Sequence, residues 1–333
     1  MTDLRFDLLG IGNAIVDVIA RAEEDFLVRE KLVKGSMRLI DANEAERLYG
    51  AMAPAIETSG GSAGNTVAGI ASLGGKAAFI GKLAADQLGQ IYRHDMRAQG
   101  VDFQTPAQNG GPPTARCMII VTPDGERTMN TYLGACLELM PADIDAKTVE
   151  AAEITYMEAY LYDPPQAKEA FRVAAAIAHR AGRKVSLTLS DSFCVDRYRS
   201  EFLAMIKDGT IDILLANEHE LKSLYETSSL AAGLEALGHD CRLAAVTLGA
   251  KGCAVLSKGK IEEIPAFPVA EVVDLTGAGD LFAAGFLFGI ARKMPNRAAA
   301  RLGAIAAAAV IGHIGPRPAG SLKELAERHA LLA

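Results

Sequence analysis

The stretch Asp274-Leu275-Thr276-Gly277-Ala278-Gly279-Asp280 runs directly into a long apolar segment, which predicts a helix over residues 278–293. Glycines let backbone N–H groups turn toward a ligand, and a helix N-terminus adds partial positive charge, so the turn suits a phosphate. We therefore expect the backbone N–H groups of Gly277, Ala278 and Gly279 to hold a phosphate oxygen. Asp280 would be the general base that takes a proton from an attacking hydroxyl. The alternative is an ordinary helix cap, which leaves the crowding of Asp274 and Thr276 unexplained.

A second glycine-rich loop, Ser59-Gly60-Gly61-Ser62-Ala63-Gly64-Asn65, precedes a predicted helix over residues 63–73. Gly61 would permit close approach of a substrate, and Ser62 and Asn65 could hydrogen-bond it. The loop also matches the G-x-S-x-G elbow of hydrolases, with Ser62 as nucleophile. That rival needs a strong strand before the serine, and residues 54–58 are a poor one. It also leaves the turn at Gly277 without a role.

A third motif, Gly10-Ile11-Gly12-Asn13 followed by Asp17, lies near the N-terminus. Its glycines suggest a dinucleotide fingerprint, but Ile15 stands where the third glycine belongs, which weakens an oxidoreductase interpretation. No G-x-x-x-x-G-K-[ST] occurs in the sequence, so a P-loop kinase is excluded by pattern. Asn13 and Asp17 remain as polar groups in an apolar context.

A fourth motif, Asn217-Glu218-His219-Glu220, follows an apolar strand predicted at residues 211–215. Open α/β sheets bind ligands at the carboxyl ends of their strands, which favours a nucleotide site. Glu220 could hold Mg²⁺ through water. The alternative is helix capping by Asn217 with exposed glutamates. Thr247 and Gly249 close another strand and suggest a further nucleotide contact.

Strands and helices alternate beyond residue 150, which predicts an α/β fold with a mostly parallel sheet and helices on both faces. Residues 31–41 and 103–133 break the alternation and predict a small β lid, with a hairpin turning at Asp124-Gly125. We expect a single unit over residues 1–333. Its large domain would comprise about 1–30, 42–102 and 134–333, and its lid about 31–41 and 103–133.

Composition narrows the class of protein. Thirty-four basic and 41 acidic residues give a net charge of −7, which argues against a nucleic-acid partner. The five cysteines are scattered without a C-x-x-C pair, which favours a reducing compartment. The apolar stretches are too short to span a bilayer. We expect a cytoplasmic protein without a membrane partner, either monomer or homodimer.

Together these motifs resemble the ribokinase-like, PfkB-type carbohydrate kinase family. The loop at Gly60–Asn65 is similar to its N-terminal signature, the segment from Asp274 to Asp280 to its C-terminal signature, and Asn217 to Glu220 to its N-x-x-E motif. The chain is most similar to the adenosine kinase branch. The resemblance implies a three-layer α/β/α domain with a small β lid, and phosphorylation of an alcohol by ATP with Mg²⁺.

The resemblance also implies several residue roles. Asp17 would hold ribose hydroxyls together with Asn13 and Asn65, and Arg127 would act as a cationic clamp from the lid. Tyr160 would stack on adenine, with Met37 and Leu39 covering the other side. A potassium site would use Asp274 and Thr276. The triplet Ala84-Ala85-Asp86 departs from the family's Gly-Asp-Asp, which puts the first acidic position in doubt.

Two other interpretations remain open at this level. One is a sugar kinase of the same family, acting on ribose, fructose or 2-keto-3-deoxygluconate. The other is a non-catalytic protein that binds a nucleoside or nucleotide. An intact Asp280 argues against the second, since a pure binding protein has no need of a base.

Overall fold

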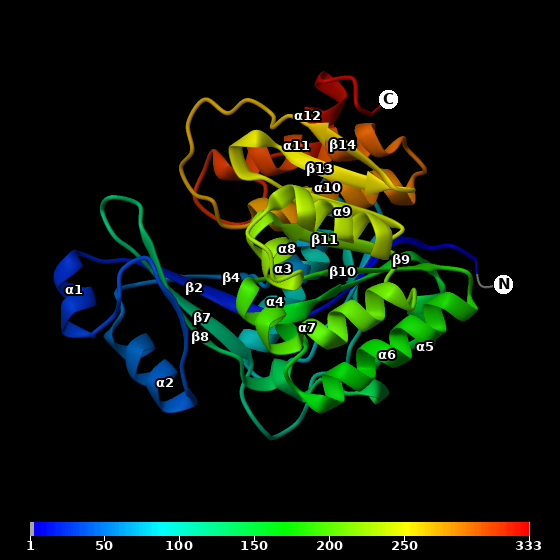
Figure 1. Ribbon diagram of the computed structural model, residues 1–333. Helices are drawn as coiled ribbons and strands as arrows, with labels where there is room; N and C mark the ends of the chain where they lie inside the picture. Colours follow the sequence, from blue (N-terminus) through cyan, green and yellow to red (C-terminus); the bar gives the residue numbers. More distant parts are fainter. Residues whose placement is uncertain (1–2, 333) are drawn as a thin grey trace.

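The computed structural model describes residues 3–332 and contains two β-sheets (Figure 1). The larger has the order β14-β13-β12-β11-β10-β9-β1-β5-β6. All its neighbouring strands run parallel except at one edge, where β12, β13 and β14 pair antiparallel. Its strands are β1 (Phe6–Ile11), β5 (Ala77–Ile80), β6 (Val101–Phe103), β9 (Ala152–Glu158), β10 (Lys184–Thr188), β11 (Ile213–Asn217), β12 (Leu243–Thr247), β13 (Cys253–Ser257) and β14 (Lys260–Ile264).

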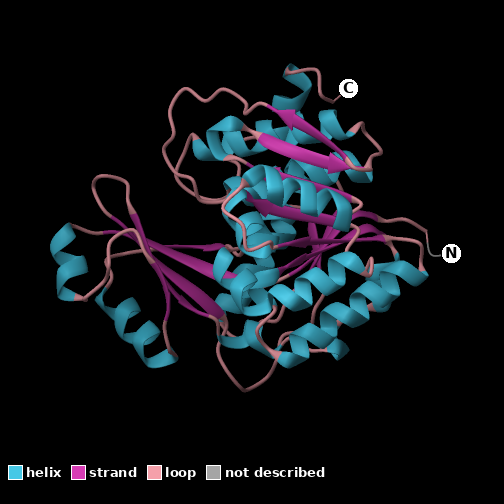
Figure 2. Cartoon of the chain, in the orientation of Figure 1, coloured by secondary structure: helices cyan, strands magenta, loops and turns pink. Residues whose placement is uncertain are grey.

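Helices cover both faces of this sheet, as Figure 2 shows in cyan around the magenta strands. Successive strand residues point to opposite faces, so Leu8 and Leu9 of β1 enter two different hydrophobic clusters. One face is covered by α5 (Ala146–Glu150), α6 (Pro165–Arg180), α7 (Ser192–Lys207), α8 (Glu218–Leu224) and α9 (Leu230–Asp240). The other is covered by α3 (Ser62–Ser72), α4 (Gln87–Ala98), α10 (Ala278–Ala291), α11 (Asn296–Ile311) and α12 (Leu322–Arg328). The three-layer α/β/α architecture is confirmed.

Helix α10 lies in the middle of its layer. Every residue from Leu281 to Ala291 is buried, as expected for a helix that is apolar on all sides. It packs against α11, α3 and the sheet, and small residues allow the close approach. A Cβ on Gly69 would lie 2.6 Å from the Cβ of Ala284, and one on Gly285 would lie 2.5 Å from the carbonyl oxygen of Leu302. The N-terminus of α10 is therefore held at a fixed distance from the sheet.

The second sheet has the order β3-β8-β7-β2-β4 and extends to one side of the large domain in Figure 1. Its strands are β2 (Ile15–Arg21), β3 (Met37–Leu39), β4 (Ile56–Ser59), β7 (Ala115–Val121) and β8 (Arg127–Tyr132). Helices α1 (Glu24–Arg29) and α2 (Ala42–Ala51) pack on its outer face, and we call this whole unit the lid. The expected lid boundaries were too narrow, because β2, β4, α1 and α2 also belong to it.

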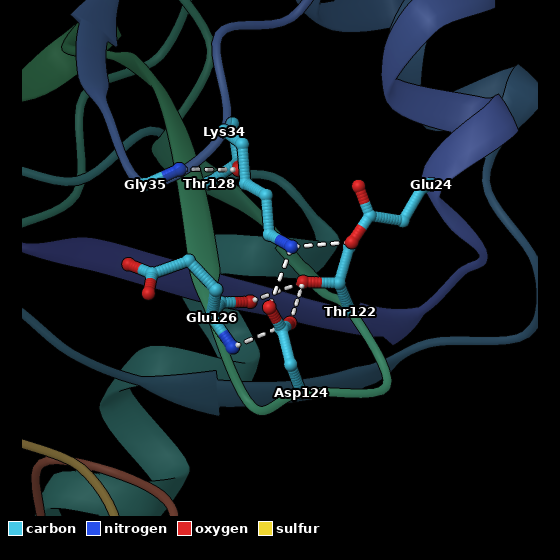
Figure 3. Close-up of polar contacts among 7 residues, drawn as sticks. All are labelled: Glu24, Lys34, Gly35, Thr122, Asp124, Glu126 and Thr128. Carbon is cyan, nitrogen blue, oxygen red and sulfur yellow. Dashed lines mark hydrogen bonds and ion pairs between the residues drawn. The ribbon is translucent and has the colours of Figure 1, made fainter.

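The predicted hairpin is confirmed by the antiparallel pairing of β7 with β8. Figure 3 shows how its turn is fixed. Asp124 accepts hydrogen bonds from the hydroxyl of Thr122 at 2.7 Å and from the N–H of Glu126 at 3.3 Å. Lys34 reaches Asp124 at 2.5 Å and also contacts Glu24 at the start of α1. This network joins three separate segments at the outer end of the lid.

Four short 3₁₀ helices connect the regular elements in the described part of the chain. They are Gly134–Glu138, Pro141–Asp143, Ala159–Leu161 and Gly249–Lys251. The strand order reverses direction at β1, which has β5 on one side and β9 on the other. Open α/β sheets bind ligands in the crevice at such a switch point, beyond the carboxyl ends of the strands.

The packing of α10 yields a test of the fold. We expect Gly285→Ala to destabilise the protein by about 1–3 kcal/mol, because the new methyl group meets backbone atoms of Leu302 and Gly303 that cannot rotate away. Gly238→Ala on α9 is the matched control, since its Cβ meets only a Leu256 side-chain atom at 3.6 Å. Helix propensity should make that variant neutral or slightly more stable. Denaturant unfolding of both variants measures the difference, and equal stabilities would contradict this account of the helix contact.

Candidate active site

A cavity of about 670 Å³ lies between the lid and the carboxyl ends of the large-sheet strands. Its volume is in the range of small-molecule sites. The predicted residues that line it are Asn13, Asp17, Met37, Leu39, Gly61, Ser62, Asn65, Tyr160, Asn217, Glu220, Thr247, Thr276, Gly277, Gly279 and Asp280. The four sequence motifs, which are up to 270 residues apart, therefore face one space.

Asp280 lies in the first turn of α10 and is held by the first turn of α3. The Ser62 hydroxyl donates to Asp280 Oδ1 at 2.7 Å, and the Asn65 amide donates to Oδ2 at 2.9 Å. Gly277, not Asp280, is the N-cap residue of α10. Burial raises the pKa of Asp280, while Ser62, Asn65 and the charge of Arg317 oppose that rise. The carboxylate is thus oriented from outside its own helix, which an ordinary cap would not require.

The environment of Ser62 disagrees with the hydrolase interpretation. Its hydroxyl donates to a carboxylate, and no histidine is among the described residues that line the cavity. The strand before it, β4, is a four-residue edge strand of the lid, whereas a nucleophile elbow follows a strand of the main sheet. The dinucleotide interpretation also fails, because β1 leads into the strand β2 and not into a helix.

Arg317 is a site residue that the sequence analysis did not identify. Its Nε donates to Asn65 Oδ1 at 2.8 Å, and its Nη1 donates to Gln99. It therefore fixes which way the Asn65 amide faces, so that the amide nitrogen points at Asp280. The signal in the sequence was a basic residue within the Pro- and Gly-rich segment 315–318.

The turn before α10 contains the predicted residues Gly277, Ala278 and Gly279. Gly277 has φ 80°, in the left-handed region, and a Cβ there would lie 2.7 Å from the carbonyl oxygen of Pro316. No side chain caps this helix. We expected the Ala278 N–H to face the cavity. It donates instead to the Leu275 carbonyl at 3.2 Å. A Cβ on Gly279 would meet nothing within 4 Å, so the fold itself does not demand glycine there.

Asn13 lies on the connection between β1 and β2, and Asp17 lies on β2. Asp17 is 8% exposed, and burial raises its pKa to about 7 against the lowering effect of Arg317 and Arg127. A Cβ on Gly60 would clash with the carboxylate of Asp17, so glycine at this position makes room for that carboxylate. The side-chain oxygen of Asn13 is buried without a hydrogen-bond partner. Both groups are available to a polar substrate.

Glu158, the second site residue that the sequence analysis missed, ends β9. It accepts the N–H of Asn13 at 2.7 Å and that of Ala63 at 2.6 Å, and burial raises its pKa to about 7. It thus joins the β1–β2 connection to the start of α3 and also lines the cavity. The signal was present in the sequence, since Glu158 follows an apolar strand just as Asn217 does.

Asn217 and Glu220 form a capping box at the start of α8. The Asn217 side chain accepts the Glu220 N–H at 2.9 Å, and Glu220 accepts the Asn217 N–H at 2.9 Å. Asn217 therefore caps α8, as the alternative interpretation of this motif expected. Glu220 is nevertheless 4% exposed, lines the cavity, and has a pKa raised by burial to about 7. Thr247 lines the cavity too, whereas Gly249 is exposed beyond it.

Arg127 and Asp274 do not line the cavity and contact each other, with 3.0 Å between Nη2 and Oδ2.

The segment Ala84-Ala85-Asp86 has a structural role in this chain. Asp86 is the N-cap of α4, accepting the N–H of Gly89 at 2.8 Å and the hydroxyl of Thr114 at 2.6 Å. Ala84 forms a β-bridge with Gln108.

Comparison with known proteins identifies the family. The model of the pfkB family carbohydrate kinases matches residues 40–322. The chain belongs to this family. It is therefore a small-molecule kinase, and the kinases of this family use ATP, usually with Mg²⁺. The resemblance drawn from the motifs is confirmed.

Individual relatives differ in the substrate that their names state. A crystal structure of a probable sugar kinase from Rhizobium etli is 53% identical, with TM-score 0.93, and covers 99% of this chain and 100% of its own. Adenosine kinase from Sinorhizobium meliloti is 55% identical, with TM-score 0.91, and covers 98% and 99%. A fructokinase from Klebsiella pneumoniae is 26% identical over 81% of this chain and 89% of its own length. All three relatives are named as kinases, whereas the acceptors that their names state differ.

The described acidic side chains around the cavity do not form an enclosed metal site. Within residues 3–332 no group of three or more histidine, cysteine or acidic side chains could enclose an ion. Mg²⁺ does not need such an enclosure in kinases, because waters and substrate phosphates supply most of its ligands. Glu220, buried at the cavity wall, fits an outer-shell role for the Mg²⁺ that family members use.

No helix in the described range is long and apolar enough to cross a membrane.

The raised pKa of Asp17 predicts how stability depends on pH. The folded pKa of about 7 lies above that of an unfolded aspartate, about 3.9. The folded protein therefore holds a proton that the unfolded chain releases, and this stabilisation is lost as pH rises toward about 7. We expect substrate-free Asp17→Asn to gain thermal stability relative to wild type between pH 5 and pH 7.5.

Thermal unfolding of the two proteins across that range measures the effect. The exposed Asp25→Asn variant on α1 is the control and should run parallel to wild type throughout. A constant difference between Asp17→Asn and wild type over the whole range would show that Asp17 is ionised in the empty site.

Proposed function

We propose that this kinase transfers the γ-phosphoryl group of ATP to the 5′ hydroxyl of adenosine, giving AMP and ADP. The observation that carries the proposal is the carboxylate of Asp280, which Ser62 and Asn65 hold at the head of α10 within the cavity. A carboxylate oriented by two donors next to glycine-rich backbone suits deprotonation of a hydroxyl beside a phosphate.

The chemistry asks mainly for position and charge. The 5′ oxygen forms a bond to the γ-phosphorus, the bond from that phosphorus to the bridging oxygen breaks, and the proton passes to Asp280. A base must be ionised, and the hydrogen bonds from Ser62 and Asn65 oppose the effect of burial on the pKa of Asp280. The open space at Gly279 supports a phosphate seated against the first turn of α10.

The acceptor half of the proposal rests on two kinds of residue. Asp17, Asn13 and Asn65 are buried polar groups at the cavity that suit ribose hydroxyls. Tyr160 lines the cavity from the 3₁₀ helix that follows β9, and Met37 and Leu39 line it from the edge of the lid with about half their surface exposed. An aromatic ring and apolar side chains in one cavity suit the stacking of a nucleobase. The 55% identical adenosine kinase supports the same acceptor.

On the donor side, we infer that Asn217, Glu220 and Thr247 contact the nucleotide and its Mg²⁺ ion. All three line the cavity at the carboxyl ends of β11 and β12. When bound, Mg²⁺ neutralises phosphate charge. Glu220 would take part through water, because its carboxylate already accepts two bonds from Asn217.

A sugar acceptor is the second candidate. The observation in its favour is Glu158, a buried carboxylate that lines the cavity near Asn13 and suits a hydroxyl-rich ligand without a base. The relatives named fructokinase and probable sugar kinase favour the same alternative.

The role of Asp280 is tested by substitution. We expect Asp280→Asn to lower kcat by about 100- to 10,000-fold, the range for loss of a general base, while ATP binding stays near that of wild type. Ser62→Ala is the matched control. It removes one donor to the carboxylate and leaves the base, so it should retain much more activity. Turnover of Asp280→Asn within tenfold of wild type would exclude Asp280 as the base.

The acceptor is tested by comparing kcat/KM for adenosine, ribose, fructose and 2-keto-3-deoxygluconate. Stacking on a base contributes ~1–3 kcal/mol, so Tyr160→Ala should lower kcat/KM for adenosine by about ten- to a hundredfold and spare the sugars. Tyr160→Phe keeps the ring and should behave like wild type. If a sugar is the better substrate, or if Tyr160→Ala lowers all four values equally, the nucleoside assignment fails and the kinase assignment survives.

A further inference from the structure

An ion pair joins the lid to the segment that leads into the turn at Thr276 and Gly277, which precedes Asp280 and is called the catalytic turn below. Arg127 is the first residue of β8, and Asp274 lies six residues before Asp280. Their side chains are 6% and 7% exposed, and Nη2 lies 3.0 Å from Oδ2. A pair removed from water to this degree is screened weakly, so its charges interact more strongly than those of a surface pair.

The carboxylate of Asp274 is engaged on both oxygens. Oδ1 accepts the Thr276 N–H at 2.9 Å, and Oδ2 accepts the Gly315 N–H at 2.8 Å besides contacting Arg127. Burial acts to raise the pKa of Asp274, but these N–H groups and the arginine lower it below its ordinary value. The group is therefore an anion with its own counter-charge already present.

The expected potassium ion does not fit this arrangement. An ion bound by Asp274 would share Oδ2 with a guanidinium 3.0 Å away, so two like charges would lie together with little water between them. Thr276 offers a backbone N–H to the same carboxylate, and an N–H repels a cation.

The donors of Arg127 are also incompletely used. Both terminal nitrogens are buried without a hydrogen-bond partner, since the contact with Asp274 has the distance of an ion pair but not the geometry of a hydrogen bond. Unpaired buried donors cost free energy, so charge attraction is what keeps the guanidinium at this position. Arg116 on the same hairpin differs, because it pairs with Glu46 inside the lid at 2.7 Å.

We propose that the guanidinium of Arg127 takes the place of a monovalent cation beside Asp274, so that the position of the lid, not potassium, supplies the positive charge behind the catalytic turn. The inference rests on the kinase reaction proposed above. Arg127 acts here as a positioning residue, because Asp274 lies between it and the turn at Thr276 and Gly277. It also gives the lid a direct means of ordering that turn.

The experiment compares KCl, NaCl and choline chloride at equal ionic strength. We expect wild-type kcat, and the thermal unfolding temperature without substrate, to be the same in all three salts. Arg127→Met should lose at least tenfold in kcat and recover part of it with K⁺ or with free guanidinium. Arg127→Lys keeps the charge and should remain insensitive to the salt. Arg116→Met is the control for loss of a lid arginine and should resemble wild type.

Direct titration with Tl⁺, a potassium mimic, completes the test and needs no turnover. We expect no saturable binding to wild type and binding to Arg127→Met. Activation of wild type more than about fivefold by K⁺ over choline, or saturable Tl⁺ binding to wild type, would overturn the inference even if Arg127→Met does not fold. A protein that phosphorylates no acceptor would instead refute the proposed reaction, and the unfolding and Tl⁺ measurements would still decide the cation question.

Discussion

The first turns of α3 and α10 meet at Asp280, and the arrangement of the cavity depends on that contact. Ser62 and Asn65 donate from α3, and the carboxylate accepts from α10. The two helices can meet only because they pack closely further along, where Gly69 faces Ala284. Since α3 follows a lid strand and α10 follows the turn at Gly277, one hydrogen-bonded carboxylate joins the lid side of the cavity to the side formed by α10.

The second constraint is electrostatic. The carboxyl groups of Asp17, Glu158, Glu220 and Asp280 line the cavity, and their negative charges would repel the triphosphate of the ATP that kinases of this family use. Burial raises all four pKa values, three of them to about 7, so the empty site carries less negative charge than the residue types indicate. Arg317 and the N-terminus of α10 add the opposite sign. A net charge of −7 is therefore compatible with an anionic substrate.

Sequence reasoning predicted the features that local chemistry determines. Alternating strands and helices predicted the mostly parallel sheet with helices on both faces, and glycine turns ahead of helices located Asp280 and Ser62. It failed where long-range pairing decides the outcome. Strand β4 reads Ile-Glu-Thr-Ser and has weak strand character, so only its pairing with β2 defines it. Arg317 and the Arg127–Asp274 pair each join residues over 140 apart, and no periodicity reports such contacts.

The segment before the catalytic turn shows why such a contact matters. Val272 and Leu275 are 57% and 68% exposed, so little apolar packing holds this stretch. Its position depends on a few polar bonds, chiefly those of Asp274 and the N–H of Val273 to the Ile311 carbonyl at 2.8 Å. A segment held by so few contacts is easily displaced. Because one of those contacts comes from Arg127 of the lid, the position of the turn depends on the position of the lid.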